Sequence, residues 1–275
     1  VGSRFGGVHP GAPIFSALLS LIEVEKISGE KLLKGIITGY ETTIRLAAAM
    51  QPYHHSRGYH PTGTCGSIGA TIALAVSLGF NKEEMKKAFS NAVLHASGSL
   101  KILEGASDLK PLNVSHAAHL AIMAIHNTRI GFNVPDDVMM GNNGFIAMVA
   151  GRYSESTLLG NNDSPAIMKV YFKLFAACRH CHSPIEALLN LTRTNKIVLE
   201  DIKTIRVKTY NYVIGRHDHK DIYGSASAKM SIPYSISAAL LFGDAQDEHF
   251  SQTALNNPQI RKVIDKVEVI EDLAL

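Results

Sequence analysis

The sequence predicts a mainly α-helical fold, in which an all-helical domain is followed by a smaller α+β domain. In residues 28–44 the apolar side chains recur every three or four positions, which is the spacing of one buried helix face. After Lys173 the pattern changes, because residues 202–209 alternate in part and are rich in β-branched side chains, as a half-buried strand is. We therefore expect a helical domain over residues 1–170 and an α+β domain over residues 171–275.

Capping and pairing signals locate the helices of the first domain. Ser28 is the expected N-cap of the helix that follows it, and Asn81 with Glu84 has the spacing of a capping box. Glu41 and Arg45 lie one helical turn apart and favour a helix as an ion pair. The expected elements are two helices within residues 12–50, helices over 64–78, 81–95 and 114–130, and loops over 51–62 and 96–113.

The second domain carries weaker signals. Ser183 and Pro184 are typical of an N-cap and the first helical residue, so we expect a helix from there to Arg193. The other expected elements are strands over residues 202–209 and 266–270 and helices over residues 235–242 and 258–264.

Composition excludes several classes of protein. The 275 residues are 46% hydrophobic and 19% charged, which is an ordinary globular composition. The net charge of +3, without a run of Lys and Arg, gives no argument for nucleic acid. We find no apolar stretch of about 18 residues and no leader pattern, so we expect neither a membrane span nor secretion. Three cysteines cannot form a disulfide framework, which predicts a reducing, cytoplasmic compartment.

The densest group of reactive side chains lies between Lys173 and His182, and it has four interpretations. Cys178, Cys181 and His182 match C-x-x-C-H, the attachment motif of c-type haem, and the same residues are possible zinc ligands. The two cysteines are also a candidate redox pair. In the fourth interpretation the cysteines are incidental, and Lys173, Arg179 and His182 bind an anion.

The surrounding sequence gives little support to the metal and redox interpretations. A zinc site needs a fourth ligand, and no second C-x-x-C or H-x₃₋₅-H module follows. A thioredoxin-like pair belongs between a strand and a helix, which the preceding residues do not predict. A haem- or zinc-binding protein, using Cys178, Cys181 and His182, stays the alternative from another class.

Two His-Pro dipeptides form a second group of candidates. In each, proline holds the preceding residue, His9 or His60, in an extended conformation just before a helix. Free N–H groups and the helix macrodipole favour an anion at such a position. Lys110 stands in the Gly- and Ser-rich loop, where a lysine is ordinarily solvated. The basic residues Arg216, His217, His219 and Lys220 are interpreted as a solvated loop.

Taken in order, these motifs resemble the MmgE/PrpD family, whose members include 2-methylcitrate dehydratase, cis-aconitate decarboxylase and iminodisuccinate epimerase. The motifs are His9-Pro10-Gly11, Gly58-Tyr-His-Pro-Thr-Gly63, His95-Ala-Ser-Gly98, Leu109-Lys-Pro-Leu112 and Lys-x-Phe-x-Ala-Cys-Arg-x-x-His from Lys173 to His182. Residues 39–41 with Arg45, and residues 228–234, fit two further family segments.

The resemblance implies a helical domain, a smaller α+β lid domain, a homodimer and an active site in the cleft between the domains. It implies catalytic roles for His60, His9, Lys110 and Lys173, and substrate binding by Arg179, His182 and Lys229. The family's substrates are small di- or tricarboxylates, and its chemistry needs no metal and no other cofactor. No nucleic acid or membrane partner is implied.

The implied reaction removes a proton next to a carboxylate, and the cations stabilise the enolate that forms. His60 is the first choice of base, while His9 and His182 are candidates for protonating the leaving group or binding a carboxylate. The resemblance favours a hydro-lyase of the 2-methylcitrate dehydratase type. An iminodisuccinate-type epimerase and a cis-aconitate decarboxylase are the alternatives within the family.

The chain departs from the family pattern at both ends. The family has an acidic motif upstream of His-Pro-Gly and continues beyond the lid domain, and neither part is found here. The chain also lacks an initiator Met, and the last expected strand ends five residues before Leu275. We therefore expect that sequence is missing at both ends.

Overall fold

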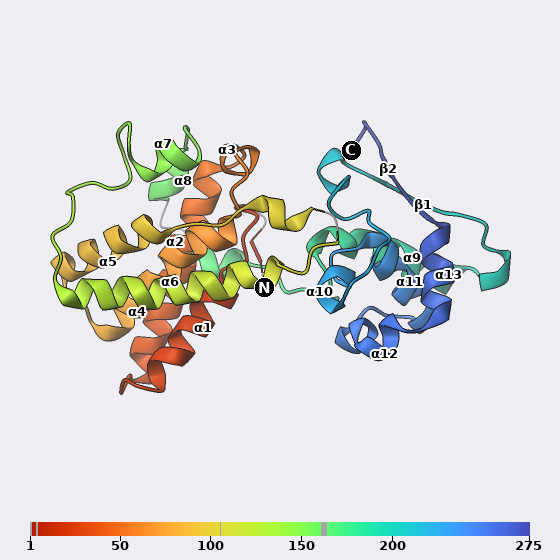
Figure 1. Cartoon of the computed structure of the whole chain (residues 1–275), viewed down its shortest axis with the longest axis horizontal. Coiled ribbons are helices and arrows are strands. Elements are labelled where there is room, and N and C mark those ends of the chain that lie inside the picture. The colour runs from red at the N-terminus through yellow and green to blue at the C-terminus, as the bar shows by residue number, and fades with distance from the viewer. Residues whose placement is uncertain (1, 4, 105, 161–163) are drawn as a thin grey trace. The chain divides into compact units, whose positions relative to one another are not determined.

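A computed structural model describes residues 2–3, 5–104, 106–160 and 164–275, and it divides them into two compact units (Figure 1). The first unit comprises Val1–Leu100 and Leu112–Phe172, and the second comprises Lys101–Pro111 and Lys173–Leu275. Lys101–Pro111, which the sequence assigns to the first domain, thus group with the second unit. The fold is mainly helical, with one small sheet in the C-terminal part, as expected.

The first unit is built of helices. They are α1 (Gly11–Ile22), α2 (Gly29–Met50), α3 (Tyr53–Ser56), α4 (Pro61–Leu78), α5 (Lys82–His95), α6 (Lys110–Ile130), α7 (Phe145–Val149) and α8 (Glu155–Leu159). Two short 3₁₀ helices, Leu100–Leu103 and Ala166–Lys169, connect them.

Helix α4 lies at the centre of the first unit and packs against α1, α2 and α5. It is apolar on all sides, as a fully enclosed helix is. Gly69 allows α2 to approach closely, because a Cβ there would stand 1.8 Å from the Thr43 hydroxyl oxygen and 2.7 Å from the Gly39 carbonyl oxygen. The small residues of α4 therefore set the spacing of the core helices.

The same helix corrects one expectation from the sequence. By length and composition α4 is long and apolar enough to cross a membrane, whereas we expected no such stretch. Of its 18 residues 89% are buried inside the structure, and the core helix of a folded unit passes the same test.

The expected capping residues occupy their places. The Ser28 hydroxyl accepts from the Lys31 N–H at 3.3 Å. The Asn81 side chain accepts from the N–H of Glu84 at 3.0 Å, and the Glu84 carboxylate accepts from the Asn81 N–H at 2.8 Å. Glu41 and Arg45 form the expected ion pair.

Helices α4 and α6 begin earlier than expected, and a short helix lies within a predicted loop. The loop over residues 51–62 contains α3, and α4 begins at Pro61 rather than at residue 64, which makes His60 its N-cap. Helix α6 begins at Lys110 rather than at residue 114. Lys110 is thus the first residue of a 21-residue helix and not part of a loop.

The second unit is a small α+β fold. Its elements are α9 (Arg179–Thr194), β1 (Ile205–Thr209), α10 (Ser225–Ala228), α11 (Ile232–Phe242), α12 (Gln252–Leu255), α13 (Pro258–Lys266) and β2 (Val267–Glu271), with 3₁₀ helices at Leu199–Asp201, Asn211–Val213 and Asp247–Phe250. The strands pair in parallel, with Ile205 opposite Val267 and Thr209 opposite Glu271. Buried α11 packs against both α9 and α13 and forms the centre of this unit.

Helix α9 shows that the predicted N-cap at Ser183 is wrong. The helix begins at Arg179 with Cys178 as its N-cap, so Pro184 lies inside it. Proline within a helix removes a backbone hydrogen bond and costs about 3 kcal/mol. Burial of Cys181, Ile185 and Leu188 on one face offsets that cost, because apolar burial stabilises by about 25 cal/mol per Å². The five additional residues, a little more than one turn, place Cys178 and Arg179 at the helix start.

Candidate active site

The second unit contains a cavity of about 410 Å³ with three lysines in its wall. Lys110 comes from the start of α6, Lys173 from the segment before α9, and Lys229 from the end of α10. Two sulfur-containing side chains, Cys178 and Met230, also line the cavity. A cavity of this volume accepts a small organic ligand, and its charge favours an anion.

Two of these lysines have no carboxylate partner among the described residues. The Lys110 ammonium contacts the sulfur atoms of Met230 at 3.3 Å and Cys178 at 3.8 Å. The Lys173 ammonium donates to the carbonyl oxygen of Ala177 at 3.1 Å. Burial lowers the pKa of Lys173, and the positive charge of Lys110 lowers it further. An anion bound between these ammonium groups would offset the repulsion.

Lys229 differs from the other two lysines. It forms an ion pair with Asp247, and its side chain is one-third exposed. Its positive charge is therefore partly balanced before any ligand binds, although it lines the same cavity.

Cys178 lies in a strongly cationic setting at the N-terminus of α9. Burial by itself raises the pKa of its thiol, but the nearby ammonium of Lys110 and the imidazole of His217 more than offset this and hold the pKa well below its usual value. The helix N-terminus adds to the same effect. The sequence interpretation of Cys178 as incidental therefore misses a thiol in the cavity wall whose pKa the neighbouring cations lower.

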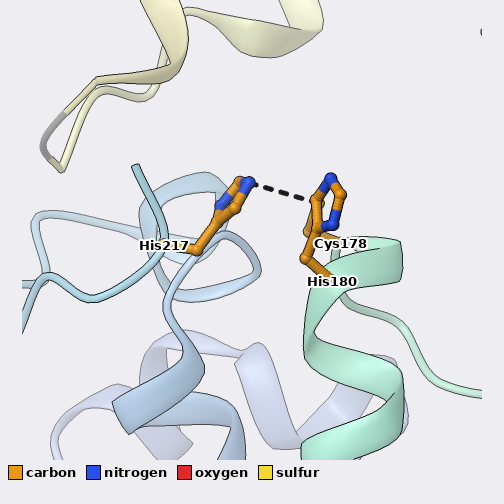
Figure 2. Close-up of side chains that lie close together, drawn as sticks. All are labelled: Cys178, His180 and His217. Carbon is orange, nitrogen blue, oxygen red and sulfur yellow. Dashed lines mark hydrogen bonds between the residues drawn. The ribbon is translucent and has the colours of Figure 1, made fainter. Parts of the chain in front are cut away.

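His217 was also missed, because the sequence suggests a solvated basic loop around it. Only 1% of His217 is exposed, and its Nδ1 lies 3.0 Å from the Met230 carbonyl oxygen, to which it donates. Its Nε2 points toward the Cys178 sulfur at 4.0 Å (Figure 2). No spacing in the sequence connects these two residues, since 39 positions separate them.

His180 stands beside His217 in the same group. The two rings stack with centroids 4.9 Å apart, and His180 Nδ1 is hydrogen-bonded to the Tyr210 hydroxyl. Burial lowers the pKa of His180 to about 4. Cys178 acts against this shift, while His217 and Lys110 add to it. One ring nitrogen of each histidine and the Cys178 sulfur all lie within 4.8 Å of one another.

Arg179 and His182, the predicted carboxylate-binding residues, do not line this cavity. Arg179 is exposed at the start of α9. His182 is buried with its ring 5.2 Å from that of Phe175, and its Nε2 lies 3.4 Å from the Ala177 carbonyl oxygen. Burial lowers the pKa of His182.

The first unit holds the two predicted histidines of the His-Pro motifs. His60 is 4% exposed, and Asn113 Nδ2 donates to its Nδ1 at 2.9 Å. The same amide nitrogen lies 3.4 Å from the Ser99 carbonyl oxygen, which supports this orientation of the amide. With Nδ1 accepting, the neutral ring carries its proton on Nε2. Asn113 therefore fixes the orientation of the His60 ring.

His9 lies at the same helix start as His60. Its backbone N–H donates to the Thr62 hydroxyl oxygen at 3.2 Å, and Thr62 belongs to the first turn of α4. The two His-Pro motifs are therefore neighbours in the first unit. The haem and zinc interpretations require Cys178, Cys181 and His182 as one group, whereas the group of possible metal ligands among the described residues is Cys178, His180 and His217.

A helical unit with paired His-Pro motifs, and an α+β unit with a lysine-lined cavity, together define a mainly helical protein of two units. The chain belongs to the MmgE/PrpD family: residues 5–156 match the MmgE/PrpD N-terminal domain and residues 175–275 match the MmgE/PrpD C-terminal domain. The resemblance seen in the sequence motifs is confirmed.

Curated relatives come from the same family. The cis-aconitate decarboxylase of Homo sapiens is 27% identical over 281 residues, which cover 95% of this chain and 56% of that protein. The cis-aconitate decarboxylase of Mus musculus is 25% identical and is covered to 55%. The chain therefore spans about half the length of the curated relatives it matches.

Proposed function

We propose that this chain is part of a lyase that decarboxylates a tricarboxylate of the cis-aconitate type. The observation that carries the proposal is the cavity of the second unit, where Lys110 and Lys173 have no carboxylate partner among the described residues. The similarity to cis-aconitate decarboxylases gives the substrate to be tested first. Dehydration of a 2-methylcitrate-like substrate, which the sequence motifs favour, stays the second candidate.

The proposed chemistry needs cations more than it needs a strong base. When an unsaturated tricarboxylate loses CO₂, the electron pair of the broken C–C bond moves into conjugation with a remaining carboxylate. The resulting anion is more basic and more concentrated in charge than the substrate, so fixed positive groups stabilise it preferentially. Lys110 and Lys173 are the groups proposed for this task, and Lys229 is proposed to bind a second carboxylate.

The cycle closes when carbon receives one proton. His60 is proposed as the proton donor in its imidazolium form: transfer of one proton to carbon leaves the neutral ring, and solvent then restores the imidazolium. Asn113, bonded to Nδ1, holds the ring in place. This replaces the role of base that the motif resemblance suggests for His60. Dehydration would instead require a base for the C–H proton and an acid for the leaving hydroxide.

The test uses the full-length natural protein with cis-aconitate, 2-methylcitrate and iminodisuccinate in heavy water. A decarboxylase releases CO₂ from cis-aconitate and places one solvent deuteron on the product carbon. A dehydratase consumes 2-methylcitrate without CO₂ release, and an epimerase exchanges the C–H proton of iminodisuccinate for deuterium without loss of CO₂ or water. Decarboxylation of cis-aconitate supports the proposal, and its absence at protein concentrations near that of the substrate overturns it.

A further inference from the structure

We propose that Cys178, His180 and His217 form a binding site for a soft divalent transition-metal ion of the zinc class. One sulfur and two imidazole nitrogens lie within 4.8 Å of one another in the second unit (Figure 2). This set differs from the Cys178, Cys181 and His182 set that the C-x-x-C-H spelling suggests, since only Cys178 belongs to both.

The distances fit a metal after a small adjustment of side chains. Zn–S and Zn–N bonds of about 2.3 and 2.0 Å place the donors of a tetrahedral site roughly 3.5 Å apart. The Cys178 sulfur and His217 Nε2 are 4.0 Å apart, so a half-ångström movement brings them to that separation. The rings of His180 and His217 are stacked, with their planes 27° apart, so one ring must also rotate out of the stack, because a metal lies in the plane of each ligating ring.

Both histidines are already held as metal-ligating histidines are. His217 Nδ1 donates to the Met230 carbonyl oxygen, and His180 Nδ1 is bonded to the Tyr210 hydroxyl. Such hydrogen bonds at Nδ1 fix the orientation of each ring and leave its Nε2 as the nitrogen that binds the metal. Cys178 and His217 are buried, with 6% and 1% of each exposed, while His180 is partly exposed.

The chemistry of the donors selects the metal. Thiolate and imidazole favour Zn²⁺, Co²⁺ and copper over Mg²⁺ and Ca²⁺, which prefer oxygen. Three protein ligands leave a fourth position for water or another small ligand. Lys110, whose ammonium contacts the Cys178 sulfur at 3.8 Å, must give up that contact when a cation binds. The ion therefore competes with Lys110 for the thiolate.

The test is a Co²⁺ titration of the full chain, followed by absorption, with Zn²⁺ as competitor. We expect a near-ultraviolet sulfur-to-cobalt band and visible bands of a four-coordinate ion, both removed by Zn²⁺. Cys178→Ser should abolish the near-ultraviolet band, and His217→Ala should weaken binding more than tenfold. Lys110→Met, which removes the competing cation, should tighten binding severalfold.

Cys181→Ser is the matched control, because Cys181 is a fully buried cysteine three residues away and outside the proposed set. It should leave the spectrum and the affinity unchanged. Circular dichroism checks the fold of every variant, and His180→Ala replaces Cys178→Ser if the latter does not fold. The proposal is overturned if the unmodified chain gives no sulfur-to-cobalt band. It is also overturned if Cys178→Ser, or His180→Ala in its place, binds Co²⁺ as the unmodified chain does. Loss of Co²⁺ binding in Cys181→Ser would overturn it as well. The readout is independent of turnover, so it does not depend on the proposed lyase function.

Discussion

Cys65 in the first unit and Cys178 in the second are both buried, but the pKa values of their thiols move in opposite directions. Cys65 lies in α4, where burial raises its pKa to about 12. At Cys178 burial acts in the same direction, but Lys110 and His217 outweigh it and lower the pKa. Depth of burial alone therefore does not decide the ionisation of a cysteine, because the charges that face the sulfur decide it.

Buried polar groups differ between the units in the same way. In the first unit His54 is fully enclosed and bonded to the Thr64 hydroxyl, and His60 is bonded to the Asn113 amide. These partners are neutral. In the second unit Lys110, Lys173 and Lys229 line one cavity and carry charge. The first unit thus arranges neutral hydrogen bonds around a dense core, while the second gathers positive charge at a cavity.

The largest expected effect tests the charge of the second unit. Lys173→Met keeps the length of the side chain but removes the ammonium group from the cavity, so we expect kcat/KM on the identified substrate to fall by about 10³-fold. Lys203→Met is the control, because Lys203 is exposed in the same unit and does not line the cavity. Steady-state kinetics with both variants decides the matter. Equal activity of Lys173→Met and the natural protein would remove the cavity from the proposed site.

The second prediction tests whether His60 and Asn113 of the first unit take part in proton transfer in addition to packing. His60→Gln should lower kcat by about 10²–10⁴-fold if the ring transfers a proton. Asn113→Leu removes the donor that fixes the tautomer, and should lower kcat by about tenfold with a changed pH profile. Asn113→Gln should restore part of the activity. His126→Gln, on an exposed position of α6, is the control. A purely structural role of Asn113 would leave the pH profile unchanged.

The third prediction concerns the packing of the first unit. Gly69→Ala places a methyl group 1.8 Å from the Thr43 hydroxyl oxygen and 2.7 Å from the Gly39 carbonyl oxygen, so α2 and α4 must separate. We expect a loss of about 2–3 kcal/mol in the free energy of unfolding. Gly29→Ala is a matched control at the start of α2, with no atom within 4 Å of the added carbon. Urea unfolding of the two variants should give clearly different midpoints.

Much of the fold could be predicted from the sequence because its signals are local. The Ser28 cap, the Asn81–Glu84 capping box and the strand at β1 each depend on residues within a few positions of one another. Proline was the main source of error. Pro184 favours a helix start in any short window, and only the burial of the α9 face against α11 shows that the helix continues through it.

The candidate site could be predicted only in part, for a related reason. The lysines of the cavity stand in recognisable motifs, but His217 and Tyr210 contribute through contacts with residues 30 or more positions away. The histidines at 217 and 219 resemble a solvated loop until the Met230 carbonyl and the Cys178 sulfur are placed beside His217. The homodimer and the cytoplasmic location implied by the resemblance stay predictions.

The smallest expected effect is a dependence of stability on pH that belongs to the first unit. Burial, followed by the charge of neighbouring His55, lowers the pKa of His54 from 6.5 to about 4. Between these two values His54 binds a proton in the unfolded chain but not in the folded chain. The free energy of unfolding therefore decreases as the pH falls from about 6.5 toward 4. By pH 5 the loss from this residue is about 2 kcal/mol.

His54→Gln cannot titrate, and it should therefore show a smaller difference between its urea midpoints at pH 7 and pH 5 than the natural chain does. His126→Gln, an exposed change on α6, should keep the natural difference. Far-ultraviolet circular dichroism at both pH values measures these midpoints. If His54→Gln loses as much stability as the natural chain between pH 7 and pH 5, the proton is taken up elsewhere. The neutral hydrogen bonding ascribed to the first unit would then not include the His54–Thr64 pair.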